Sequence, residues 1–236
     1  MQPIPQNYMA YDRTIVVFSP DGRLLQVEYA RQAVKRGSTA IGITIDKGVV
    51  LGAIKSSMPL TVSDTSKKVF EIDDHIGLVG SGILADARYL VEMARVKSQI
   101  NEITYGEPVS IQTLTKYLAN HKHMATQYAG LRPFGVGLLI GGFDNTGSNL
   151  YETDPSGTMI EWKAQAIGRG AEKAKKILKA GFKDNMSAKE GVKLVIKALK
   201  AGEKDVTKEG MEIAIITEKE FKKISGSDID KLTKAK

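Results

Sequence analysis

The sequence predicts an α+β fold in which two largely antiparallel sheets face each other and helix pairs cover their outer faces, a four-layer αββα sandwich. The first observation is the order of patterns along the 236 residues: strands, two helices, strands, two helices, strand. The second is that paired helices cannot each be a single crossover between parallel neighbouring strands, so antiparallel pairing is expected. The third is that no stretch resembles a linker, which predicts one domain.

The N-terminal part predicts a tail, a turn and one helix. Residues 1–13 carry proline and polar breaks without any period, which is typical of a tail. Residues 14–18 form a short apolar run, and the Ser-Pro-Asp-Gly sequence at 19–22 is typical of a reverse turn. Over residues 23–36 apolar side chains recur on one helical stripe, and the glycine at position 37 is a stop signal.

The first block of strands and helices comes next. Residues 38–45 and 49–54 predict a buried hairpin, because small and bulky side chains alternate around the turn at 46–48. A second strand pair and two long helices follow. We expect these strands at 68–72 and 76–80, and the helices at 84–103 and at 110–129 with Ser110 as N-cap.

The same order then repeats. Its elements are predicted as strands at 134–143, 149–153 and 158–167, helices at 170–180 and 187–201 with Ser187 as a helix N-cap, a strand at 211–217 and a short helix from 218. The polar residues from 225 onward are expected to fray.

Composition excludes several classes of protein. With 42% hydrophobic and 26% charged residues, the chain cannot be wholly disordered, collagen-like or a coiled coil. The absence of cysteine excludes disulfides, thiolate zinc sites, iron–sulfur clusters and a cysteine nucleophile. No apolar run approaches the roughly 20 residues of a membrane span, and the first residues lack the features of a secretion signal. We therefore expect a cytoplasmic protein without a membrane partner.

The formal charge of +7 raises the question of a nucleic-acid partner. The basic excess lies in the last third, because residues 1–162 are close to neutral while residues 163–236 carry 19 basic and 11 acidic side chains. Most of these basic side chains are lysines spread over predicted helices and interleaved with acidic residues. This pattern favours a solvated helix face, so no nucleic-acid partner is expected.

Candidate cofactor and metal sites fail on their spacing. The Gly-Arg-Gly at 168–170 follows a strand and opens a helix, but Lys173 occupies the place of the third glycine of a dinucleotide fingerprint. His121 and His123 point to different faces of a helix, so they are not an i, i+4 zinc pair. Ser81 has no obvious base nearby, and no Gly-x-Ser-x-Gly motif is present. The sequence predicts neither a cofactor nor a metal.

Several longer stretches are recognisable together. They are Tyr11-Asp12-Arg13, Phe18-Ser19-Pro20-Asp21-Gly22-Arg23-Leu24, Gln26-Val27-Glu28-Tyr29-Ala30, Ala33-Val34, Arg132-Pro133-Phe134-Gly135-Val136, Leu150-Tyr151-Glu152-Thr153-Asp154-Pro155-Ser156-Gly157 and Ala166-Ile167-Gly168-Arg169-Gly170. The early stretches resemble the N-terminal signature of proteasome α-subunits almost letter for letter, and the later ones are similar to the same family. The resemblance covers essentially residues 8–220, and a generic α sequence of this kind looks archaeal.

The resemblance implies the sandwich of the N-terminal nucleophile hydrolases, and it raises the question of catalysis. In the related β-subunits, autolysis exposes a threonine whose own α-amine serves as base, helped by a lysine and an acid. Alignment with the β-subunits places Ser38 directly after the cleavage point and Lys68 at the position of the β-subunit lysine. The position of the β-subunit acid is occupied by Ile54, so the acid is missing. Because the helix over 23–36 should be retained, the nitrogen of Ser38 stays an amide. We expect a non-catalytic subunit of a threonine-type endopeptidase complex; a self-processing hydrolase that uses Ser38 is the alternative.

For an α-subunit the resemblance implies the outer, seven-membered rings of the 20S core particle, which cap the β-subunit rings in ATP-dependent protein degradation. Residues 1–13 would be the gating tail, residues 14–224 the sandwich domain with its helix at 23–36, and residues 225–236 a polar tail. Unfolded protein substrates would pass the ring on their way to the β-subunits.

The resemblance also implies roles for single residues. Tyr11, Asp12 and Arg13 would contact neighbouring tails and hold the gate open, and Pro20 would set where the tail leaves.

A pocket between neighbouring subunits would receive the C-terminal tails of a regulatory AAA ATPase. There Lys68 would pair with the terminal carboxylate, and Gly82 and Ile83 would give backbone and apolar contacts. Glu28 is assigned to activator binding with them.

Overall fold

The structure is a computed structural model that describes residues 16–55, 60, 67–203, 206–207 and 210–224. Its elements, in chain order, are α1 (Leu25–Arg36), β1 (Ala40–Ile45), β2 (Gly48–Ile54), β3 (Val69–Asp73), β4 (Ile76–Gly82), α2 (Leu84–Tyr105), α3 (Ile111–Met124), β5 (Val136–Asp144), β6 (Gly147–Thr153), β7 (Met159–Glu161), β8 (Ala164–Ile167), α4 (Ala171–Gly181), α5 (Ala188–Gly202), β9 (Met211–Ile216) and β10 (Phe221–Ile224). The proposed tail at 1–13, with Tyr11, Asp12 and Arg13, and the proposed tail at 225–236 lie outside the described residues.

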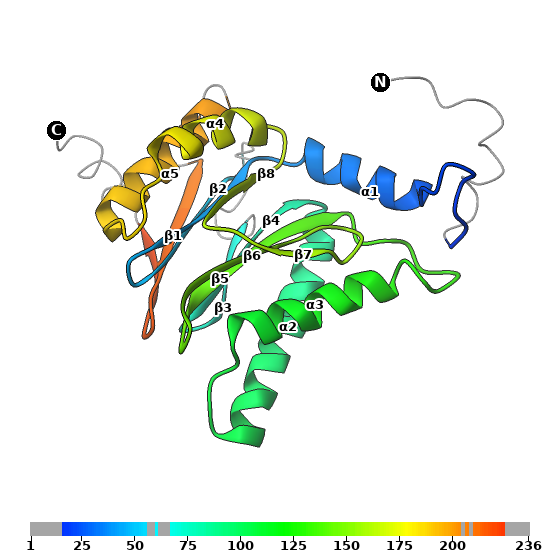
Figure 1. Ribbon diagram of the computed structural model, residues 1–236, viewed down its shortest axis with the longest axis horizontal. Coiled ribbons are helices and arrows are strands. Elements are labelled where there is room, and N and C mark those ends of the chain that lie inside the picture. Colours follow the sequence, from blue (N-terminus) through cyan, green and yellow to red (C-terminus); the bar gives the residue numbers. More distant parts are fainter. Residues whose placement is uncertain (1–15, 56–59, 61–66, 204–205, 208–209, 225–236) are drawn as a thin grey trace.

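The predicted αββα sandwich is confirmed (Figure 1). One five-stranded sheet has the order β10-β9-β2-β1-β8 and the other the order β3-β4-β5-β6-β7, and neighbouring strands in both are antiparallel. Helices α4 and α5 cover the first sheet, while α2 and α3 cover the second. An apolar core lies between the two sheets, and one further core lies beneath each helix pair. The four layers therefore follow from burial on both faces of each sheet.

Helix caps explain where several helices begin and end. Ser110 accepts a hydrogen bond from the Thr113 N–H, and Ser187 forms a complete capping box with Glu190, so both predicted N-caps are confirmed. The helix predicted over 110–129 ends at Met124 instead. The Thr126 hydroxyl donates to the His123 carbonyl oxygen at 2.7 Å, and this local bond replaces a helical one.

Two predictions in the second half are wrong. Residues 158–167 are not one strand: β7 pairs with β6 in one sheet, the chain crosses at Trp162 and Lys163, and β8 pairs with β1 in the other. No short helix begins at Glu218; after a turn, β10 pairs with β9 at the sheet edge. Both errors concern strands of three or four residues, which are too short to show a period.

Helix α1 precedes the sandwich and lies across the ends of β4 and β5 (Figure 1). Leu25 and Val27 are its buried side chains, and Val34 packs against Gly137 of β5. Among the described helices, none has the length and apolar content that a membrane crossing requires. The end of α1 leads directly into β1, and this junction carries three of the predicted site residues, Lys68, Gly82 and Ile83.

Candidate functional site

The junction between α1 and β1 is built around Gly37 and Ser38. Gly37 ends the helix, and its N–H donates to the carbonyl oxygens of Ala33 and Val34, both at 3.1 Å. A Cβ at Gly37 would come within 2.3 Å of the backbone nitrogen of Gly82, so only glycine fits there. The Ser38 carbonyl oxygen accepts a hydrogen bond from the Ser81 hydroxyl at 3.0 Å. In the unprocessed chain Ser38 follows Gly37, so its nitrogen is an amide.

The Ser38 hydroxyl lies between Lys68 and Ile54. Lys68 Nζ donates a hydrogen bond to Ser38 Oγ, and Ser38 Oγ donates its own hydrogen to the Ile54 carbonyl oxygen at 2.7 Å. The lysine side chain is buried, with 5% of the residue exposed. Burial lowers the pKa of Lys68, and nearby Arg169 lowers it further, while Glu203 and Glu212 act in the opposite direction. A hydroxyl and a lysine are therefore in contact, but the lysine acts as the donor.

The nearest carboxylates come from distant parts of the sequence. Glu203, which follows α5, accepts hydrogen bonds from the Thr39 N–H at 2.7 Å and the Thr39 hydroxyl at 2.9 Å, and pairs with Arg169. Glu212 of β9 accepts hydrogen bonds from the backbone N–H groups of Lys68 at 2.7 Å and Val69 at 3.1 Å. Both carboxylates therefore fix the backbone, and the buried Ile54 offers only its carbonyl oxygen where an acid would stand.

Sequence reasoning missed Glu203, Glu212 and Thr39. Glu203 is separated from Thr39 by 164 positions, and no motif connects them. In the sequence, Arg169 stands out only within the Gly-Arg-Gly at 168–170, where a nucleotide fingerprint would lie. Its N–H in fact donates to the Gly37 carbonyl oxygen at 2.8 Å, and its guanidinium pairs with Glu203. This stretch therefore serves the α1–β1 junction.

Three of the four residues predicted for activator binding meet at this junction. Gly82 has a φ of +118° and packs against Gly37. A side chain at position 82 would collide with the Gly135 carbonyl oxygen. The N–H of Ile83 donates to that same oxygen at 2.9 Å, and 40% of Ile83 is exposed. Lys68 reaches the junction through Ser38. The α1–β1 junction thus brings together an apolar side chain, two glycines in close backbone contact and a lysine.

Glu28 is not part of this group. It lies nine residues before Gly37 along α1, a rise of about 13 Å. There Glu28 pairs with Arg31 at 2.7 Å, and Arg31 pairs with Asp154 at 2.8 Å. The turn after β6 is thereby bound to the side of α1 that carries Glu28 and Arg31. Burial alone would raise the pKa of Asp154, but the Ser156 hydroxyl and the Arg31 guanidinium hold it below its ordinary value.

Pro20 lies exposed in the predicted turn before α1. The turn is closed by Ser19, whose N–H donates to the Arg23 carbonyl oxygen at 2.9 Å and whose hydroxyl donates to Asp21 at 2.6 Å. Gly22 has a φ of +76°. The turn thus has its own hydrogen bonds where the chain leaves toward the tail.

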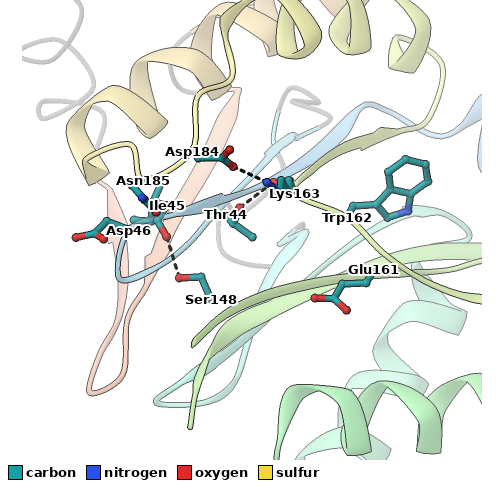
Figure 2. Close-up of a pocket in the computed structure, with 9 residues that line it drawn as sticks. All are labelled: Thr44, Ile45, Asp46, Ser148, Glu161, Trp162, Lys163, Asp184 and Asn185. Carbon is teal, nitrogen blue, oxygen red and sulfur yellow. Dashed lines mark hydrogen bonds and ion pairs between the residues drawn. The ribbon is translucent and has the colours of Figure 1, made fainter. Parts of the chain in front are cut away.

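Two hollows lie away from the junction. One, of about 800 Å³, is bounded by the turn after β1 and by the crossing between the sheets; Lys163 pairs there with Asp184 at 2.7 Å, and Ser148 donates to the Ile45 carbonyl oxygen at 2.8 Å (Figure 2). The other, of about 930 Å³, is lined by acidic turns near His75. None of the predicted site residues that the structure describes lines either hollow. Within the described ranges, no three His, Cys, Asp or Glu side chains are grouped to hold a metal ion.

Comparisons with known proteins cover nearly the whole chain. A family model described as proteasome subunit matches residues 34–216, and one described as the N-terminal signature of A-type proteasome subunits matches residues 11–33. The similar proteins include three named proteasome subunit alpha. They are 45% identical in Methanopyrus kandleri (94% of this chain and 92% of the relative), 47% in Methanocaldococcus jannaschii (98% and 89%) and 49% in Methanobrevibacter smithii (97% and 92%).

Proposed function

The chain belongs to the proteasome subunit family and carries the signature of its alpha subunits, and from this we propose that it is a non-catalytic subunit of the outer rings of the 20S core particle. Seven copies form each ring, the rings cap the β-subunit rings, and threonine-type peptidase activity resides in the β-subunits. The chain functions in ATP-dependent protein degradation in the cytoplasm.

The packing of α1 is the observation that supports a non-catalytic role. Helix α1, which precedes Ser38, is packed into the fold through Val34 on Gly137 and the Arg31–Asp154 pair, and the Gly37–Ser38 bond lies among hydrogen bonds from Ser81 and Arg169. An N-terminal nucleophile uses its own free α-amine as base, and an amide nitrogen cannot take that role. Release of the amine would require cleavage after Gly37 and loss of α1.

The Ser38–Lys68 contact is the one feature that favours the alternative, a hydrolase that uses Ser38, because serine–lysine pairs catalyse acyl transfer in other proteins. In the structure the Ser38 hydrogen is directed toward a carbonyl oxygen and not toward a base. Ser38 donates its hydrogen to the Ile54 carbonyl oxygen, and Lys68 is the donor toward Ser38. A general base would have to accept the serine proton instead. The non-catalytic role is therefore preferred.

Gating is the second part of the proposal. The residues before the Pro20 turn converge on the ring axis and obstruct substrate entry, and Tyr11, Asp12 and Arg13 hold neighbouring tails in the open arrangement. The closed turn around Pro20 supports this, because it gives the tail a fixed point of departure. Particles whose α-subunit lacks residues 1–11 should hydrolyse small peptides faster than intact particles. Equal rates would contradict the gate.

Docking of a regulatory ATPase is the third part. The grouping of Lys68, Gly82 and Ile83 around one junction supports a site for a C-terminal carboxylate, with backbone and apolar contacts beside it. Glu28 would contact the activator separately, about 13 Å along α1 from Gly37. We expect Lys68→Ala to abolish stimulation of peptide hydrolysis by the ATPase while rings still form. Full stimulation of this variant would contradict the docking site.

A further inference from the structure

We propose that the Ser38 hydroxyl competes intramolecularly for Lys68, because it occupies the ammonium group that an incoming C-terminal carboxylate has to engage. The inference rests on the proposed docking role of Lys68, and it adds a regulation of that site. The strength of the Ser38–Lys68 hydrogen bond in the empty site would then determine the affinity of the site for the activator.

Lys68 is held at two points. Its backbone N–H donates to Glu212 at 2.7 Å, so the main chain just before β3 is fixed. Its side chain is almost fully buried and ends on Ser38 Oγ. The carboxylate of Glu203 is already bound by Thr39 and by the Arg169 guanidinium. In the described part of the chain, Ser38 is thus the direct hydrogen-bond partner of the ammonium group.

The Ser38 hydroxyl presents an acceptor to Lys68 because its hydrogen is used elsewhere. The bond to the Ile54 carbonyl oxygen, at 2.7 Å, directs a lone pair of Ser38 Oγ toward Nζ. A carboxylate oxygen makes the same kind of contact and adds the attraction between opposite charges. A chain-terminal carboxylate can therefore displace Ser38, whereas a neutral chain end competes poorly.

Displacement of Ser38 costs the free energy of its hydrogen bond with Lys68, and the contacts of the docked ligand have to offset this loss. The ammonium gives up an internal hydrogen bond when it turns to the ligand, and an intramolecular hydrogen bond contributes modestly to the stability of the folded state. Removal of the Ser38 acceptor eliminates this competition. It also leaves a buried ammonium without its partner, so a carboxylate that supplies one gains more. Both effects act in the same direction and favour binding of a ligand by Lys68.

The test is a binding titration on the assembled particle of full-length chains. The probe is a fluorescent peptide with the C-terminal sequence of the cognate regulatory ATPase and a free carboxylate, followed by anisotropy. We expect Ser38→Ala to bind it about 3- to 10-fold more tightly than the wild type. Ser38→Thr keeps the hydroxyl and should bind like the wild type. The same peptide with an amidated C-terminus should bind weakly to every particle.

Two results would overturn the inference. If Ser38→Ala binds the peptide equally or more weakly while Lys68→Ala abolishes binding, Ser38 does not compete, although the docking site stands. If Lys68→Ala binds like the wild type, the docking site itself is wrong, and the inference falls with it. Should Ser38→Ala not assemble, Ser38→Cys replaces it: a thiol of similar size is a weak acceptor, so tighter binding is again expected and unchanged binding contradicts the inference.

Discussion

Asp86 organises the loop that supports the junction. Its carboxylate accepts two hydrogen bonds from the Arg132 guanidinium, both at 2.7 Å, and one from the Gly135 N–H at 2.8 Å. Gly135 in turn accepts the hydrogen bond of Ile83. One side chain in the first turn of α2 therefore fixes the backbone against which the exposed Ile83 is presented.

The pKa of Asp86 gives this arrangement a measurable pH dependence. Burial alone would raise the pKa, but Arg132 and the Gly135 N–H hold it below its ordinary value of 3.8. A carboxyl with a lowered folded-state pKa stabilises the fold above its unfolded pKa, and this contribution is lost as the pH falls through the folded value. Asp86→Asn should therefore lower the free energy of unfolding at pH 7 by about 1–2 kcal/mol, since Arg132 is 60% exposed and water weakens the pair.

Urea unfolding of the full chain at pH 7 and at pH 3 tests this prediction. The difference in unfolding free energy between wild type and Asp86→Asn should shrink at pH 3. The control is Glu92→Gln, which removes the exposed Glu92–Arg95 pair of the same helix and should change the unfolding free energy by no more than a few tenths of a kcal/mol. A difference between wild type and Asp86→Asn that stays constant with pH would contradict the assignment.

At the scale of elements, α3 carries a lysine into the core beneath β6. Lys122 is fully buried and donates to the Thr153 carbonyl oxygen at 2.9 Å. Burial lowers the pKa of Lys122 to about 7, although Asp154, Glu152 and Asp86 all favour its charged form. The next residue after Thr153 is Asp154, which anchors Arg31 of α1. The helix layer and α1 thus meet at one stretch of chain.

Because of the buried Lys122, the folded chain should become more stable when the pH is raised moderately above 7. Its folded-state pKa of about 7 lies below the unfolded value near 10.4, so the unfolded chain binds the proton more tightly between these limits. The free energy of unfolding should rise by about 1.5 kcal/mol from pH 7 to pH 8.5 through this group. Lys122→Met should lack this rise, whereas Lys116→Met, at an exposed position of the same helix, should retain it. Denaturant titrations with equal pH slopes for wild type and Lys122→Met would refute the prediction.

The sequence allowed most elements to be predicted, for physical reasons that also explain the failures. Helix α5 was predictable because its apolar stripe is long and Ser187 marks its start. Strand β10 was not, because it has four residues and its identity comes from pairing with β9. The crossing at Trp162 was missed for a similar reason: no local signal marks a change of sheet. Tertiary pairing, rather than local pattern, decides such short segments.

The candidate site was predictable only in part. The family resemblance, and no local motif, pointed to Ser38, Lys68, Gly82 and Ile83. Glu203 and Glu212 reach the site because the sheet order places β9 beside β2 and brings the end of α5 to the start of β1. Contacts of this kind depend on the closed sandwich, and a single sequence does not reveal them.

At the scale of the whole molecule, an apolar stripe on α2 is left uncovered. It includes Val96, Ile100 and Ile103, of which Ile103 is 86% exposed, and these positions fall on one side of the helix. Exposed apolar stripes of this kind are typical of surfaces that bind a protein partner. We therefore expect a neighbouring α- or β-subunit of the particle to cover this stripe.

Assembly should therefore depend on this stripe more than the fold of the chain does. We expect Ile100→Glu to reduce the fraction of chain found in complete particles by native mass spectrometry after mixing with β-subunits, because a charge would be buried at the contact. Its unfolding free energy should change by less than about 0.5 kcal/mol.

The matched control for Ile100→Glu is Gln99→Glu. It adds the same charge at the preceding exposed position, which is rotated by about 100° around the helix axis, and it should assemble normally. Normal assembly of Ile100→Glu as well would show that the stripe is not a subunit contact.

In its proposed role the chain works with α1 attached and therefore without a free amine at Ser38. Whether α1 is retained is measured by the intact mass of this chain, recovered from particles that hydrolyse peptides. We predict a mass that accounts for the whole chain of 25.7 kDa, apart from removal of the initiator methionine. A chain that begins at Ser38, after loss of residues 1–37, would rule out the non-catalytic role and establish a processed N-terminal nucleophile in its place.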